Sequence, residues 1–403
     1  MSRIYLDHAA TTPVRPAALD AFVAQAQRIG NAAALHSAGR SVKLQVADAR
    51  DRLAVTLDAH PSEIIFTSGG TEADNLAIKG LYRANRAVDE TKNVVIATGI
   101  EHPAVTDSLQ WLETHEGAQL VVVDVDAEGF VDLDAWRAAL ETHRGRIAVA
   151  TLMWANNEIG TIQPIAQVAE LCAAEQVDFH VDAVQAFGAI EATFIPGITT
   201  MAISGHKIGA PVGIGALLVR RDAKPLPVLH GGGQERDIRS GTTADALIVA
   251  FAAAAEEATT NLAEESARLA GLRDQLIAAV TAQIPEAKLQ GPADGKYRLP
   301  TNVHFSFAQA EGDSLLFGLD MAGIESSTGS ACNAGVSRPS QVILATGQDE
   351  AAARSTQRFS LGHTTTQTDI DAVIATLPGV YQAAAKAGMT AQPSSIRTAN
   401  SHR

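Results

Sequence analysis

Short aliphatic runs alternate with segments of helical periodicity through the first half of the chain, and this alternation restricts the fold more than any other feature. After a short strand-like start at residues 4–12, strands are predicted at 63–66, 93–98, 119–123, 147–152, 177–181, 199–203 and 215–219. Helical patterns lie between most of them, at 104–116, 133–143 and 165–175. Strands that are apolar on both faces and alternate with helices form parallel sheets covered on both sides. We therefore predict an α/β fold around a mostly parallel sheet.

The remaining patterns predict further helices and a second, smaller domain. Helices are expected at 16–29, 41–57 and 76–84. A helical stretch at 244–284 is predicted to lead into the second domain, with strands at 301–307 and 356–361 and helices at 314–322, 340–346 and 369–386. We place the large domain at residues 15–250 and the small domain at residues 1–14 and 251–390. The polar end, residues 391–403, is expected to be disordered.

Composition and charge exclude several classes of protein. No apolar run approaches the ~18 residues of a membrane span, and the first residues lack the basic and apolar regions of a signal peptide, so we expect a cytoplasmic protein. Two cysteines, Cys172 and Cys332, are too few for a disulfide framework or a four-cysteine metal site. The formal net charge of −14 argues against direct nucleic-acid binding, which depends on clustered lysine and arginine.

Polar residues follow the predicted strands at the edge where parallel sheets bind ligands. After successive strands come His102, then Asn156, then Asp182 with Gln185, and then the run Ser204-Gly205-His206-Lys207. Lys207 is unusual, because a lysine is almost never fully buried without a partner. It is either an amine held in a cleft, able to form a Schiff base with an aldehyde, or an ordinary surface lysine at a strand end.

A glycine-containing turn precedes the helix predicted at 76–84. The two glycines of Thr67-Ser68-Gly69-Gly70-Thr71 allow backbone amides to converge at a helix N-terminus, which favours an anion such as phosphate. The alternative is an ordinary helix whose first turn is capped by Thr71 and Asp74. The glycines favour the phosphate interpretation.

Together, the polar residues of this edge supply what a pyridoxal-phosphate site requires, namely an amine, an acid beside the pyridine nitrogen, phosphate donors and a group that lies on the ring. Lys207 is the candidate amine, Asp182 the acid and His102 the stacking group. The candidate phosphate ligands are Gly70, Thr71, Ser204 and His206, and the candidate donors to the phenolate oxygen or the substrate are Gln185 and Asn156.

The two cysteines and one arginine have distinct sequence surroundings. Cys332 lies among small and polar residues without an apolar period, so it is either a nucleophile on a loop or an incidental cysteine. Cys172 lies in the helix predicted at 165–175 among aliphatic residues, and we interpret it as a small core residue. Arg358 could bind a substrate carboxylate through two hydrogen bonds, or form a surface salt bridge.

A series of motifs extends from residue 5 to about residue 362. They are Tyr5-Leu-Asp-His-Ala-Ala-Thr-Thr-Pro13, residues 66–80, Glu101-His102, Asn156-Asn-Glu-Ile-Gly160, His180-Val-Asp-Ala-Val-Gln185, Ser204-Gly-His-Lys207, the glycine-rich residues 230–242, Gly329-Ser-Ala-Cys332 and Arg358-Phe-Ser-Leu-Gly362. In these motifs the chain resembles the cysteine desulfurases of the NifS/IscS group, most closely the actinobacterial IscS-like members. The resemblance implies a fold-type-I pyridoxal-phosphate enzyme with a large, mostly parallel seven-stranded sheet domain and a smaller α+β domain. It also implies a homodimer with its sites at the subunit interface.

The family's reaction converts L-cysteine to L-alanine and leaves the sulfur on the enzyme as a persulfide. By resemblance, Lys207 is the Schiff-base lysine, Cys332 the persulfide-forming nucleophile and His102 a stacking, proton-shuttling residue. The other implied roles are Asp182 as pyridinium partner, Gly70, Thr71, Ser204 and His206 as phosphate ligands, Gln185 as donor to the phenolate oxygen, Asn156 and Arg358 as ligands of the substrate carboxylate, and Thr242 as a contact to the phosphate of the partner subunit.

Departures from the family pattern leave some questions open. Residues 208–213 and 333–335 differ from those of many relatives, and the C-terminal tail does not match the tail that docks a scaffold protein in other members. The sulfur acceptor therefore stays open between an iron–sulfur scaffold protein and a tRNA thiolase. A selenocysteine lyase, another fold-type-I lyase or aminotransferase, and a non-catalytic assembly scaffold are the alternative functions. A transient iron–sulfur ligand role for Cys332 also stays open, because one cysteine does not define a metal site.

Overall fold

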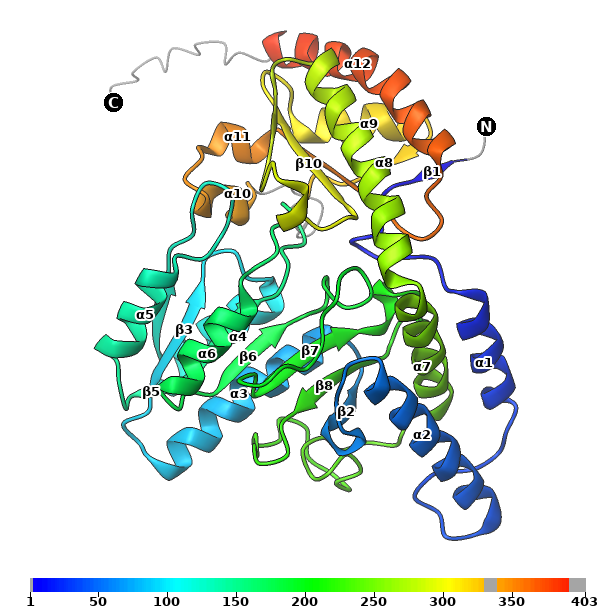
Figure 1. The fold of residues 1–403 in the computed structure, drawn as a ribbon, viewed down its shortest axis with the longest axis vertical. Helices are drawn as coiled ribbons and strands as arrows, with labels where there is room; N and C mark the ends of the chain where they lie inside the picture. Colours follow the sequence, from blue (N-terminus) through cyan, green and yellow to red (C-terminus); the bar gives the residue numbers. More distant parts are fainter. Residues whose placement is uncertain (1–2, 330–338, 391–403) are drawn as a thin grey trace, which may run out of the picture.

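The fold, given by a computed structural model that describes residues 3–329 and 339–390, is built on a seven-stranded sheet (Figure 1). Its strand order is β2-β8-β7-β6-β5-β3-β4. The strands are β2 Ile64–Thr67, β3 Val94–Thr98, β4 Gln119–Val123, β5 Ile147–Met153, β6 Phe179–Asp182, β7 Thr200–Ser204 and β8 Gly215–Val219. β8 is antiparallel to both neighbours, and the other pairs are parallel. The predicted α/β fold with a mostly parallel sheet is confirmed.

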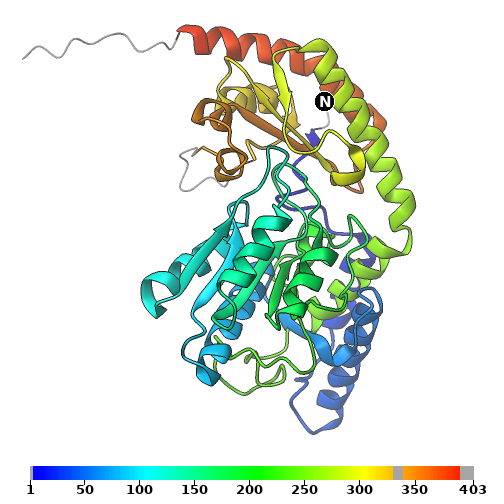
Figure 2. The ribbon, with the colours of Figure 1, turned by 60° about the vertical axis from the view of Figure 1, so that its left-hand side comes forward.

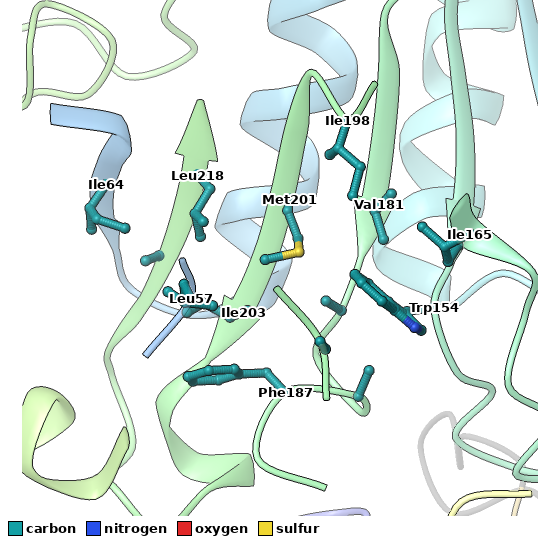
Figure 3. Close-up of a cluster of buried hydrophobic side chains, with 14 of the residues drawn as sticks. Leu57, Ile64, Trp154, Ile165, Val181, Phe187, Ile198, Met201, Ile203 and Leu218 are labelled. Carbon is teal, nitrogen blue, oxygen red and sulfur yellow. The ribbon is translucent and has the colours of Figure 1, made fainter. Parts of the chain in front are cut away.

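Helices cover both faces of this sheet, because successive strand residues bury their side chains on opposite sides. Met201 and Ile203 of β7 belong to one apolar cluster, whereas Ala202 between them belongs to another. Figure 3 shows part of the first cluster, with Met201, Ile203 and Trp154 pointing into it. The helices are α1 Pro16–Ala26, α2 Ser37–Val55, α3 Gly70–Val88, α4 Pro103–Glu116, α5 Leu133–Thr142, α6 Ile165–Ala174 and α7 Asp245–Thr260, with short 3-10 turns η1 Pro61–Glu63 and η2 Gly205–Lys207.

A smaller, antiparallel sheet lies beyond one end of the large sheet (Figure 2). Its strand order is β12-β10-β9, and its own apolar cluster includes Leu276, Phe305 and Phe359. The elements of this part are α8 Leu262–Gln283, β9 Ala287–Leu289, η3 Gly295–Tyr297, β10 Asn302–Phe307, α9 Gly312–Met321, β11 Ile324–Glu325, α10 Gln341–Ala345, α11 Glu350–Arg354, β12 Thr356–Ser360 and α12 Gln367–Thr390. β1 Ile4–Tyr5 pairs with β11. The domain bounds at 15–250 and at 1–14 with 251–390 stay a prediction, and residues 391–403 lie outside the described part.

The single helix predicted at 244–284 is wrong, because α7 and α8 meet at a bend of 71°. Near the bend, the hydroxyl of Thr259 donates to Ala255 O at 2.8 Å and that of Thr260 donates to Glu256 O at 2.7 Å. Such hydroxyl bonds to the preceding turn often bend helices, and β-branched residues have lower helix propensity. In the described residues, no single helix is long and apolar enough to cross a membrane. Only the bent pair α7 and α8, taken together, reaches the length and apolar composition of a membrane span.

Candidate active site

A cavity of about 390 Å³ lies between the carboxyl edge of the large sheet and the small sheet. Its lining includes nearly all of the predicted site residues that the structure describes, namely Gly70, Thr71, His102, Asp182, Gln185, Ser204, His206, Lys207 and Arg358. These residues are far apart in the sequence; all except Arg358, which lies within β12, end or follow strands of the large sheet. The sheet topology therefore brings these residues together. This agrees with the prediction that polar residues after parallel strands meet at one edge of the sheet.

Lys207 occupies the end of η2, directly after β7. Its Nζ donates to Ala10 O at 2.9 Å and also to Ala9 O. Burial, and then the nearby Arg358 cation, lower the pKa of Lys207 to about 8. A lysine with such a pKa is partly an uncharged amine near neutral pH, which is the form that attacks a carbonyl group.

The first turn of α3 forms one end of the cavity. This helix begins at Gly70, six residues before the predicted start at residue 76. A Cβ atom at Gly70 would lie 2.6 Å from Val184 Cγ2, so a side chain at this position would collide with Val184 in the cavity lining. The buried Ser204 Oγ has no hydrogen-bond partner in the described structure. Burial lowers the pKa of His206 to about 4, so its imidazole is neutral and can donate one hydrogen bond. This end of the cavity fits a phosphate group.

An acid and an imidazole lie deeper in the cavity. Asp182 ends β6, and its Oδ1 accepts from Val184 N at 2.9 Å. Burial raises the pKa of Asp182, whereas His102 and Lys207 favour its charged form. His102 precedes α4, and its Nδ1 accepts from Ala104 N at 3.1 Å, which leaves Nε2 free to face a ligand. Gln185 lies beside them and donates from Nε2 to Ala9 O at 2.9 Å.

Arg358 reaches the cavity from β12 of the small sheet. Its guanidinium donates to Asp7 Oδ1 at 2.8 Å and to Asn157 O at 2.9 Å, while its buried Nε has no hydrogen-bond partner in the described structure. A buried guanidinium with a free donor is suited to binding a carboxylate.

The structure does not place Asn156 in the cavity lining, and Asn157 lies there instead. Both ends of the Asn156 amide are used within the turn after β5. Nδ2 donates to Ile100 O at 2.9 Å and to Met153 Sδ at 3.3 Å, and Oδ1 accepts from the backbone nitrogens of Glu158 at 2.9 Å and Ile159 at 3.0 Å. The prediction that Asn156 binds cofactor or substrate is therefore not supported by this geometry, because the side chain has no free donor.

Two further predicted site residues are not in the lining. Thr242 is exposed and does not line the cavity of its own chain, so its contact to a partner subunit stays a prediction. Cys332 lies outside the described residues, but Gly329, three positions before it in the sequence, lines the cavity. Cys172 is buried, and burial raises the pKa of its thiol to about 12, which confirms its interpretation as a core residue.

Several acids of the cavity were assigned no part in the pyridoxal-phosphate site from the sequence. Asp74, Glu101 and Glu158 line it, and Asp7 binds Arg358. Burial raises the pKa values of Asp74, Glu101 and Glu158, in the case of Glu101 to about 8. Glu101 and Glu158 each belong to a motif after a strand, which is the signal that could have identified them.

Comparisons with known proteins agree with the geometry. The aminotransferase class-V family matches residues 4–373. An IscS-like cysteine desulfurase of Mycobacterium tuberculosis is 49% identical over 388 residues, which is 96% of this chain and 98% of that protein. A NifS-like protein structure has a TM-score of 0.87 and 30% identity, covering 94% of this chain and 99% of the other. The structure of SspA in complex with cysteine has a TM-score of 0.75 and 33% identity, covering 89% and 98%. The chain therefore belongs to the aminotransferase class-V family, within the NifS/IscS group of cysteine desulfurases.

Proposed function

We propose that the protein is a pyridoxal-phosphate-dependent cysteine desulfurase that converts L-cysteine to L-alanine and leaves the sulfur on Cys332 as a persulfide. The observation that supports it most directly is the cavity itself, which places the Lys207 amine, the Asp182 carboxylate and the Arg358 guanidinium around one space. The relatives that resemble it are named cysteine desulfurases, so this reaction is favoured over that of a selenocysteine lyase or an aminotransferase.

The residues present fit pyridoxal phosphate. The unpartnered Ser204 Oγ, the absent side chain at Gly70 and the neutral His206 suit its phosphate, with Thr71 beside them. Lys207 would hold the aldehyde carbon, Asp182 would face the ring nitrogen, Gln185 the phenolate oxygen and His102 the ring face. When bound, the cofactor supplies an electron sink for charge that develops on the substrate.

The residues of this chain would then divide the work of the reaction. Arg358, with its free Nε, binds the substrate carboxylate and orients the molecule. Lys207 Nζ, with its lowered pKa, accepts and returns protons near the substrate Cα. Asp182, whose charged form His102 and Lys207 favour, holds its negative charge in the site. The Cys332 thiolate attacks the substrate sulfur, so that an S–S bond forms as the substrate C–S bond breaks and a proton returns to the carbon. Cysteine and the enzyme thiol thus become alanine and the enzyme persulfide, with all atoms conserved.

We further infer a homodimer in which Thr242 contacts the phosphate at the partner's site. Thr242 is exposed at the end of the glycine-rich residues 230–241. This segment is held to its own subunit by Glu235, which accepts two hydrogen bonds of 2.8 Å from Arg50. A fixed, exposed residue is suited to reaching a neighbouring subunit. The sulfur acceptor would be another protein, either an iron–sulfur scaffold or a tRNA thiolase. The free thiol of Cys172 fits a reducing compartment such as the cytoplasm.

The experiment follows the visible absorbance of the purified protein before and after L-cysteine is added, with alanine and sulfide measured. We expect cofactor absorbance that changes with cysteine, and borohydride reduction should link the cofactor to the peptide containing Lys207. The C332A protein should keep the absorbance change but form no persulfide. Sulfide release by C332A at the parent rate would refute the role of Cys332, and faster turnover of selenocysteine than of cysteine would favour the selenocysteine lyase.

A further inference from the structure

The turn at residues 157–160, which follows β5 of the large sheet, is bound along its whole length by residues of the small-sheet part of the chain. Each of its four carbonyl oxygens accepts a hydrogen bond from that part. The pairs are Asn157 O with Arg358 Nη1 at 2.9 Å, Glu158 O with Asn302 Nδ2 at 2.8 Å, Ile159 O with Arg298 Nη1 at 3.1 Å and Gly160 O with Leu299 N at 2.8 Å. Buried carbonyl groups need such partners, and here one part of the chain supplies them all. The β5 turn, as we call residues 157–160, is therefore fixed to the small sheet.

Asn302, the first residue of β10, is the central residue of this contact. It is buried, and both ends of its amide are used. Nδ2 donates to Glu158 O, while Oδ1 accepts from Arg298 Nη1 at 3.2 Å. Gly160 has a φ of +76°, and a Cβ atom there would lie 2.7 Å from Asn302 Oδ1. The absence of a side chain at Gly160 thus allows Asn302 to lie directly against the β5 turn.

The register of the small sheet places Asn302 and Arg358 on the same face. In the β10–β12 pair, Asn302 lies opposite Ser360 and His304 lies opposite Arg358. Opposite residues share a face of the sheet, and so do residues two apart in one strand. Asn302 and Arg358 therefore both reach the β5 turn from one face, where they bind carbonyl oxygens of adjacent residues. The orientation of the Arg358 guanidinium thus depends on where the Asn157 carbonyl oxygen lies.

We propose that Asn302 is a positioning residue for binding of the substrate carboxylate, because it holds the turn whose Asn157 carbonyl oxygen orients the Arg358 guanidinium. The proposal rests on the function proposed above. Without the Asn302 amide, the Glu158 carbonyl oxygen loses its donor from the small sheet, and a buried carbonyl group without a partner is costly. The β5 turn then moves to find another donor, and the adjacent Asn157 carbonyl oxygen moves with it. The free Nε of Arg358 is no longer held in the direction of the substrate.

The test titrates L-alanine and ethylamine, which differ by one carboxylate, into the holoenzyme and follows the cofactor absorbance. The parent should bind alanine more tightly than ethylamine. N302A should reduce this preference by about 10-fold, the order expected when one hydrogen bond to a charged group is lost. R358A should abolish the preference, and adding N302A to R358A should not weaken alanine binding further. The matched control is N85A, because Asn85 also donates from Nδ2 to a carbonyl oxygen, Ala148 O at 2.8 Å, but does not line the cavity. N85A should match the parent.

Turnover and amide hydrogen exchange give two further readouts. With L-cysteine, N302A should raise KM more than it lowers kcat, so that the turnover rate falls mainly at low cysteine concentration. Exchange should be faster in N302A at Leu299 and Ile162, whose nitrogens donate to Gly160 O and to Tyr297 O between the β5 turn and the small-sheet part.

Several results would overturn the proposal. They are an unchanged preference for alanine in N302A, an equal loss of affinity for ethylamine, and a loss of alanine affinity that is as large in the R358A background as in the parent. If N302A does not fold, N302D carries the same test, because aspartate keeps the shape and the oxygen that faces Arg298 but has no amide donor. If the parent forms no alanine from cysteine, the proposed function fails, and the comparison of alanine with ethylamine still decides the role of Asn302.

Discussion

The substitution E101Q tests whether Glu101 is an uncharged acid within the cavity. Glu101 is buried, with Oε1 accepting from Thr98 Oγ1 at 2.6 Å and Oε2 without a side-chain partner in the described structure. Asp182 lies in the same cavity, and His102 and Lys207 favour its charged form. Two buried carboxyl groups in one site do not both ionise easily. We therefore expect the charge on Asp182 and the proton on Glu101.

The magnitude follows from the pKa of Glu101, which burial raises from 4.5 to about 8. The folded protein keeps a proton that the unfolded chain releases above pH 4.5, so the free energy of unfolding falls as pH rises from about 4.5 to about 8. At about 1.4 kcal/mol for each pH unit, this cost reaches at most roughly 3 kcal/mol at pH 7. Glutamine carries no titratable proton, so E101Q should be more stable than the parent at pH 7 by up to that amount. The difference should vanish near pH 4.5.

The assay is urea unfolding of both proteins from pH 5 to pH 8, after removal of bound cofactor and at equal protein concentration. The stability difference should grow with pH in favour of E101Q. With cofactor restored, E101Q should keep alanine formation within a few-fold of the parent at pH 7, because it resembles the protonated acid. If the parent instead gains stability relative to E101Q as pH rises, Glu101 is ionised and paired, and the reasoning is refuted.

Three further substitutions test other parts of the site. G70A should weaken cofactor binding at least ~10-fold in an absorbance titration, because the new methyl group would lie 2.6 Å from a valine methyl group, and unchanged affinity would contradict this contact. D7N should lower the pKa of Lys207 below about 8 by removing a negative charge that favours the ammonium, which the pH dependence of its reaction with an aldehyde measures. E235A should lower the free energy of unfolding by about 3–5 kcal/mol in urea, since it leaves Arg50 without its carboxylate, and a loss below about 1 kcal/mol would refute the importance of that pair.

The large sheet could be predicted because its strands are buried on both faces. Continuous aliphatic runs such as β3 and β5 have few other stable environments in a helix-alternating chain. The bend between α7 and α8 could not be predicted, because the periodicity continues through it. At the bend, the hydroxyls of Thr259 and Thr260 donate hydrogen bonds to carbonyl oxygens of the preceding turn and so compete with backbone N–H groups for them. Apolar spacing does not report that competition.

The site was predictable to the level of the turn but not always to the single residue. Asn156 and Asn157 are adjacent and chemically identical, and only the backbone path decides which one faces the cavity. The acids Glu101 and Glu158 were missed for a different reason. Their positions after strands indicate the edge of the site, but the sequence does not show that these two acids are buried, as they are in the structure.

The two sheets contribute different parts of the proposed chemistry, and the N-terminal residues join them. The large sheet supplies Lys207 and Asp182, whereas the small sheet supplies Arg358 and the segment that leads to Cys332. The Asp7 carboxylate accepts a hydrogen bond from Arg358. The carbonyl oxygens of Ala9 and Ala10, just after it in the chain, accept hydrogen bonds from Lys207 Nζ. Substitutions on the large sheet should therefore alter mainly the cofactor absorbance. Substitutions on the small sheet should alter mainly the turnover rate. Changes in the N-terminal turn should affect both, because this turn holds the reactive amine and the substrate-binding guanidinium in one arrangement.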